Sequence, residues 1–138
     1  MFDFSAWPPL HPLFVHFTSA LLPVSVGLDV CGKFLRRDTM LHAGWWSMLI
    51  GTAVTPLTVL YGWRWWWSMD GAELTQRMQI HQWLGVSLMV VYLALTFWRS
   101  RFHFKSKKPT IAYLIVTIAV TLLLAWQGHL GAEMSFGT

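Results

Sequence analysis

Four apolar segments, each close to the length needed to cross a bilayer, constrain the fold more than any other feature of the sequence. They predict helices at about 10–31, 41–63, 78–99 and 110–130. The chain is 55% hydrophobic and 12% charged, with a mean hydropathy of +0.47, which is too apolar for a soluble domain of 138 residues. The sequence therefore predicts an all-α protein with a single domain over residues 1–138, an integral membrane four-helix bundle. No internal sequence repeat is evident.

The basic residues are distributed unevenly between the connections. Eight of the ten Lys and Arg residues follow the first and third apolar segments, whereas the connection after the second segment has few. Because cytoplasmic loops are enriched in Lys and Arg, we expect those two connections in the cytoplasm and both termini on the periplasmic side of a bacterial inner membrane. Topology and anionic lipid account for the basic pI of about 9.6, so we expect contact with the lipid bilayer and no nucleic-acid partner.

Four histidines map to the predicted periplasmic end: His11, His16, His81 and His129. Imidazoles in an apolar sequence are costly unless something binds them, and neutral imidazole is a common axial ligand of haem iron. Since His16 and His81 lie near the starts of two helices that begin on the same side, they are at similar depths and are the preferred iron-binding pair. His11 and His129 could form a second pair or leave one spare ligand. The sequence thus predicts one haem b, with enough ligands for a second, held without thioether bonds because no C-x-x-C-H motif is present.

Three residues near these histidines suit the edge of a porphyrin. Gly85 lies one turn after His81 on the same helix face, which would let a flat ring approach the backbone. Arg77 lies one turn before His81, and Arg64 leaves the second apolar segment at the same level. Either arginine could bind a haem propionate. The alternative is that both side chains simply extend to water.

Tryptophan is also concentrated at the predicted periplasmic end, which suggests an aromatic wall there. The residues are Trp7, Trp63, Trp65, Trp66, Trp67, Trp83 and Trp126. Other chemistries find less support. No acidic or basic residue falls in the middle of a predicted helix, Asp29 being near the inner end, which disfavours a proton or ion pump. No nucleophile is accompanied by a recognisable base and orienting acid, which disfavours a hydrolase.

Several motifs together resemble a known family. They are His11-Pro12-x-x-Val15-His16-Phe17 at the start of the first helix, Gly62 at the end of the second, His81 at the start of the third, and the closing residues 131–136. This pattern resembles the bacterial four-helix membrane family catalogued as domain of unknown function 2231. The resemblance implies a b-type haem-binding membrane protein of a kind often found beside redox proteins.

The chain departs from the family pattern at three places. Thr18 stands where the family commonly has Pro, and Trp63 begins a run that replaces an Asp. The closing motif lacks the family's final His, and His129 in the preceding turn is the residue that could replace it. These departures leave the number of haems and the ligand pairing open.

The leading hypothesis is a b-type cytochrome that transfers electrons near the periplasmic face, with membrane redox subunits or a periplasmic electron carrier as partners. The alternative is a cofactor-free or pigment-contacting accessory subunit of a larger membrane redox or photosynthetic complex, because buried and lipid-facing helices have similar compositions. An electron-transfer protein is expected in preference to a stand-alone enzyme.

Overall fold

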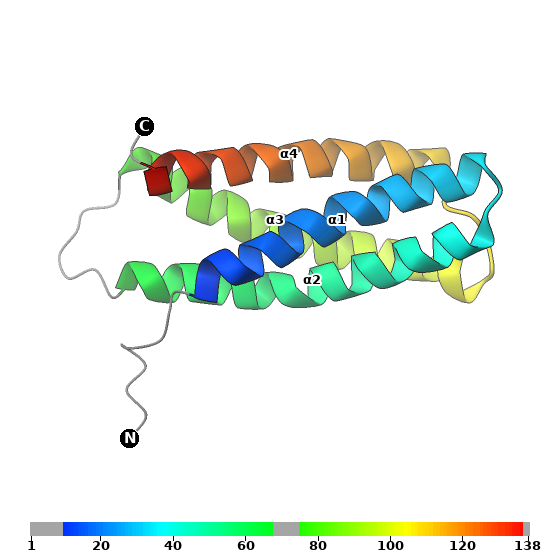
Figure 1. Cartoon of the computed structure of the whole chain (residues 1–138), viewed down its shortest axis with the longest axis horizontal. Helices are drawn as coiled ribbons and strands as arrows, with labels where there is room; N and C mark the ends of the chain where they lie inside the picture. The colour runs from blue at the N-terminus through cyan, green and yellow to red at the C-terminus, as the bar shows by residue number, and fades with distance from the viewer. Residues whose placement is uncertain (1–9, 68–74, 137–138) are drawn as a thin grey trace, which may run out of the picture.

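A computed structural model describes residues 10–67 and 75–136, which form four antiparallel helices (Figure 1). They are α1 (Leu10–Phe34), α2 (Asp38–Trp67), α3 (Gln76–Phe104) and α4 (Ile111–Phe136). All four are long and apolar enough to cross a membrane. The shortest such span has 24 residues, about 36 Å at 1.5 Å per residue, against a bilayer core of about 30 Å. The prediction of an all-α chain with four membrane-spanning helices is confirmed.

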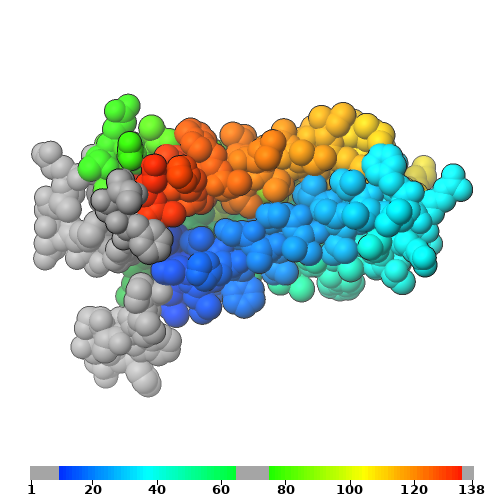
Figure 2. All heavy atoms as spheres, turned by 45° about the horizontal axis from the view of Figure 1, so that its top comes forward, coloured from blue at the N-terminus to red at the C-terminus, as the bar shows by residue number. Residues whose placement is uncertain are grey.

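The helices form a closed ring, in which α1 contacts α2 and α4, and α3 contacts the same two helices. Figure 2 shows α4 lying along α1 over the length of the bundle. The centre of the ring is filled by Leu22, Met48, Tyr92 and Tyr113, which are fully buried. Large apolar side chains such as Phe97 remain exposed on the outside, as expected of helices that face lipid.

The observed helices extend further than predicted toward the two turns. α2 begins at Asp38 instead of about residue 41, and α3 continues to Phe104 instead of ending near residue 99. An acidic residue in the first turn stabilises the positive end of the helix dipole, and Arg and His in the last turn of α3 stabilise its negative end. The basic residues predicted to lie in a loop therefore belong partly to α3.

α1 and α3 end in the same type of turn. Each turn contains one residue in the left-handed region, Arg36 with φ 54° and Ser106 with φ 51°. In both turns the N–H of the next residue donates to the carbonyl five positions earlier, with an N···O distance of 2.9 Å. This is the Schellman arrangement, which satisfies the last carbonyls of a helix before the chain reverses.

Several features of the α1–α2 hairpin recur in the α3–α4 hairpin with an offset of 70 residues along α1 and α3, although α1 packs much more closely on α2 than α3 does on α4. The paired positions include the left-handed turn residues, a fully buried core residue in each hairpin, a buried ion pair and two histidines. These pairs are Arg36 and Ser106, Leu22 and Tyr92, Asp29 and Arg99, and His11 and His81. The structure thus reveals an internal repeat that the sequence comparison did not reveal.

The interior of α2 contains Pro56, which cannot donate a backbone hydrogen bond. The carbonyl that it leaves without its helical donor is that of Thr52. The Thr55 hydroxyl donates to this carbonyl at 2.7 Å. Side-chain hydroxyls commonly replace a missing backbone donor in membrane helices, which explains why α2 continues through the proline.

Candidate functional site

The bundle has two chemically different ends. α1 and α3 both start at one end, which we call the histidine end, and both finish at the other, the turn end, where the α1–α2 and α3–α4 turns lie (Figure 1). The predicted site residues all belong to the histidine end.

His11 is half-buried in the first turn of α1 and faces α2. Its Nδ1 lies 2.9 Å from the carbonyl oxygen of Thr58. One turn further along α2, Gly62 leaves room for the ring, because a Cβ at that position would lie 2.9 Å from the His11 Cε1. A larger residue there would push the imidazole away from its carbonyl partner.

His81 has the same environment in the second hairpin. Its Nδ1 lies 3.1 Å from the carbonyl oxygen of Gln127 on α4. A Cβ at Gly131, again one turn further along, would lie 2.9 Å from the His81 Cε1. The repeat therefore places two half-buried imidazoles at the same level of the bundle, each fixed by a backbone carbonyl and a glycine.

The hydrogen bonds determine which ring nitrogens remain available. A carbonyl oxygen can only accept, so Nδ1 of His11 and of His81 must carry the proton. The Nε2 atoms then have free lone pairs, and within the described part of the chain neither makes a hydrogen bond. Two neutral imidazoles whose Nδ1–H groups bind backbone carbonyls have the arrangement common among metal-ligating histidines.

His16 and His129 differ from this pair. Both are exposed, and His16 makes no hydrogen bond to any residue that the structure describes. His129 is 67% exposed, with its Nε2 3.4 Å from Oε1 of Glu133. Five residues rotate a helix by about 140°, so a His11 that faces α2 directs His16 away from it. His11 and His81 thus share one environment, whereas His16 and His129 are exposed. The predicted pairing of His16 with His81 stays a prediction.

The remaining predicted contacts lie around this pair. Arg77 is exposed and forms an ion pair with Glu133 at 3.2 Å. Arg64 is exposed at the end of α2. Gly85 does not face a histidine ring: a Cβ there would lie 3.1 Å from the Gln127 amide nitrogen. The missing side chain at Gly85 thus makes room for the Gln127 side chain on α4 and does not leave an open cleft.

The predicted aromatic wall is only partly within the described structure. The rings of Trp63 and Trp83 meet edge to face with their centroids 5.9 Å apart, joining α2 to α3. Trp126 on α4 is exposed. The other four tryptophans of the predicted wall, Trp7, Trp65, Trp66 and Trp67, lie outside the residues whose side chains are described.

The turn end contains a buried ion pair that the sequence analysis missed. The Nε and Nη2 of Arg99 donate to the two carboxylate oxygens of Asp29, both at 2.8 Å, and Nη2 also donates to the Leu41 carbonyl at 2.9 Å. The side chains are 2% and 0% exposed. From the sequence, Arg99 was considered only as one of the basic residues at the end of the third apolar segment. A shared spacing could have indicated the pair, because Asp29 follows His11 and Arg99 follows His81 by the same number of residues.

Across residues 10–67 and 75–136, no three His, Cys, Asp or Glu side chains are arranged to hold a metal ion. Two imidazoles suit a metal whose other coordination positions are filled by a planar macrocycle.

The fold and the helix composition define a multi-pass membrane protein, an antiparallel bundle of four spanning helices. Residues 7–138 match the family described as "Predicted membrane protein (DUF2231)", and the chain belongs to this family. The family membership predicted from the motifs is confirmed. Searches of curated proteins and of solved structures gave no match.

Proposed function

We propose that this protein is a b-type cytochrome that binds haem b between His11 and His81 and transfers electrons near one face of the membrane. The observation that carries the proposal is that the two imidazoles have the same hydrogen-bonding pattern. Each donates Nδ1–H to a backbone carbonyl of the next helix, and each leaves Nε2 without a hydrogen bond in the described structure. Haem b, when bound, would supply one-electron redox chemistry, while the protein supplies ligands and an apolar surrounding.

The fixed hydrogen bonds support ligation in two ways. They select the tautomer in which Nε2 can coordinate iron, and they increase the basicity of the ligand. They also hold the ring orientation, because Gly62 and Gly131 permit each ring to pack directly on a helix backbone. Orientation and tautomer are thus set before any cofactor binds, which lowers the entropic cost of binding.

The distribution of charge supports an orientation with the histidine end in the periplasm. Eight basic residues lie at or near the turn end: Lys33, Arg36, Arg37, Arg99, Arg101, Lys105, Lys107 and Lys108. By the positive-inside rule this end is cytoplasmic. We propose that electrons are exchanged on the periplasmic side of a bacterial inner membrane, with membrane redox subunits or a periplasmic electron carrier.

Purified full-length protein tests the proposal directly. We expect a reduced-minus-oxidised spectrum of non-covalent haem b and a pyridine haemochrome assay that gives at least one haem per chain. His11→Ala and His81→Ala should each lose most of the haem. His16→Ala is the matched control, because it removes an exposed imidazole from the same helix and should retain the haem.

The outcomes separate the candidate ligands. Loss of haem from His16→Ala with retention in His11→Ala would restore the pairing expected from the sequence and refute ours. Full haem with an unchanged spectrum in His11→Ala and His81→Ala would exclude both residues as ligands. A wild-type protein that is colourless, and stays so after incubation with hemin, would favour the accessory-subunit alternative.

A further inference from the structure

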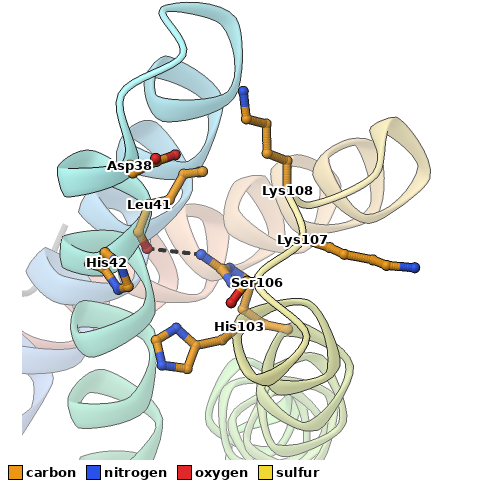
Figure 3. Close-up of a pocket in the computed structure, with 8 residues that line it drawn as sticks. Asp38, Leu41, His42, His103, Ser106, Lys107 and Lys108 are labelled. Carbon is orange, nitrogen blue, oxygen red and sulfur yellow. Dashed lines mark hydrogen bonds between the residues drawn. The ribbon is translucent and has the colours of Figure 1, made fainter.

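A second site lies at the turn end, remote from the histidine pair. A cavity of about 270 Å³ opens between α2, α3 and the segment that follows α3 (Figure 3). Its lining is mostly polar and charged and comes from Asp38, Leu41, His42, Arg99, His103, Ser106, Lys107 and Lys108. Its volume lies just below the range typical of drug-sized ligands, so it suits a small group.

The wall of this cavity contains a buried guanidinium group. Two nitrogens of Arg99 are occupied by Asp29 and by the Leu41 carbonyl, and Figure 3 shows the second of these bonds. Nη1 makes no hydrogen bond within the described part of the chain, although Arg99 lines the cavity. A guanidinium that is desolvated and fixed in one orientation is a strong donor to an oxyanion, because little rotamer entropy remains to be lost.

The other charges around the cavity favour an anion. Lys107 and Lys108 outnumber Asp38, the one acidic residue of the lining, and the charge of Asp29 is neutralised by Arg99. In Figure 3, His42 and His103 lie next to each other at one side of the cavity, whereas Lys107 extends away from it. The centroids of the two imidazole rings are 5.5 Å apart. Three positive side chains (Arg99, Lys107 and Lys108) and two negative ones (Asp38 and Asp29) leave one net positive charge at the cavity, which disfavours a metal cation.

The position equivalent to His103 in the other repeat makes a different contact. Lys33 on α1 corresponds to His103 on α3, and its Nζ donates to the Pro109 carbonyl at 2.6 Å. That contact joins the end of α1 to the segment before α4. At His103 the ring instead stacks on Trp45 with a centroid distance of 4.9 Å. The cavity therefore lies where the two repeats differ, so the repeat by itself does not account for it.

We infer that this cavity binds a phosphate group, with Arg99 and Lys108 as the donors. The phosphate could belong to a phospholipid headgroup or to free inorganic phosphate, because both present the same oxyanion. The position at one end of the bundle, where the spanning helices finish, is accessible to either source. This site does not depend on haem binding at the other end.

The test uses full-length, delipidated protein in a neutral detergent. One arm titrates inorganic phosphate and follows binding by phosphorus NMR line broadening. The other arm adds phosphatidylglycerol and counts bound lipid by native mass spectrometry. The variants are Lys108→Gln and, as a matched control, Lys105→Gln, which removes an equal charge from a residue that does not line the cavity.

Loss of one charge-assisted contact should weaken binding about tenfold in Lys108→Gln, whereas Lys105→Gln should remain within about twofold of wild type. The double variant Asp29→Asn with Arg99→Gln, which removes the guanidinium without leaving its partner charged, should not bind. Binding of inorganic phosphate identifies a free anion as a ligand, and binding of lipid alone identifies a headgroup. Absence of binding in both arms, or equal losses in Lys108→Gln and Lys105→Gln, overturns the inference.

Discussion

The two ends of the bundle differ in the chemistry of the residues that occupy equivalent positions of the repeat. At the histidine end the repeat supplies two like groups, each bonded to a helix of its own hairpin by Nδ1. At the turn end it supplies unlike groups, Asp29 and Arg99, which bond directly to each other between the hairpins. Opposite charges satisfy one another without a third component. Two imidazoles with free Nε2 lone pairs cannot bond to each other in this way. Only an acceptor of electron pairs, such as a metal ion, or a proton donor could join them.

The largest expected effect concerns the turn end. Arg99→Met should lower the free energy of unfolding by about 3–5 kcal/mol, because it leaves the Asp29 carboxylate buried without its partner. Adding Asp29→Asn should restore much of this loss. Denaturation of the purified protein in mixed micelles with increasing SDS would measure both values. Equal destabilisation of the single and double variants would show that the loss does not come from leaving the Asp29 carboxylate buried without a partner.

The next effect concerns the histidine end. Gly62→Ala and Gly131→Ala would each place a Cβ 2.9 Å from an imidazole Cε1, so the ring or the helix must move. We expect a loss of about 1–2 kcal/mol in stability and, under the proposed function, a lower haem content. Unfolding midpoints and haem-to-protein ratios measure these effects. Gly128→Ala is the matched control, because no atom lies within 4 Å of its added Cβ. A control as damaging as Gly131→Ala would contradict the packing argument.

A smaller effect should follow from removing the contact that Lys33 makes at the position equivalent to His103. Lys33→Met removes the hydrogen bond to the Pro109 carbonyl. We expect a loss of about 1 kcal/mol, because the contact is charge-assisted but only partly buried. Thermal unfolding monitored by circular dichroism would detect the change. No shift in the midpoint would mean that this bond does not contribute to the difference between the two repeats.

The smallest effect compares two buried tyrosines of the core. The Tyr113 hydroxyl is buried and has no hydrogen-bond partner among the described residues, whereas the Tyr92 hydroxyl lies 3.3 Å from Thr121 Oγ1. Tyr113→Phe should therefore be neutral or stabilising by less than about 1 kcal/mol, and Tyr92→Phe should destabilise by about 0.5–1 kcal/mol. The same unfolding assay ranks them. The reverse order would indicate that Tyr113 binds a group that these contacts do not include.

The sequence predicted the helices because apolar length is a local property, but it predicted pairs of residues less well. Arg99 was considered only as one of the basic residues at the end of the third apolar segment, and only the packed structure reveals that Asp29 neutralises it. The preference for His16 rests on depth along the helix, which the sequence indicates, and it stays a prediction. The direction in which a ring faces depends on its neighbours and could not be read from the sequence. The two imidazoles are fixed by the backbone carbonyls of Thr58 and Gln127. Every residue has such a carbonyl, so the sequence does not indicate which ones bind.

The separation of 70 residues between Asp29 and Arg99 has a consequence for biogenesis. A nascent chain that has delivered only its first hairpin to the bilayer contains an acidic group whose cation has not yet been synthesised. That intermediate resembles a misassembled protein until the third helix arrives. Chains stalled or truncated at this stage are expected substrates for membrane proteases, so the ion pair acts as a marker of completed assembly.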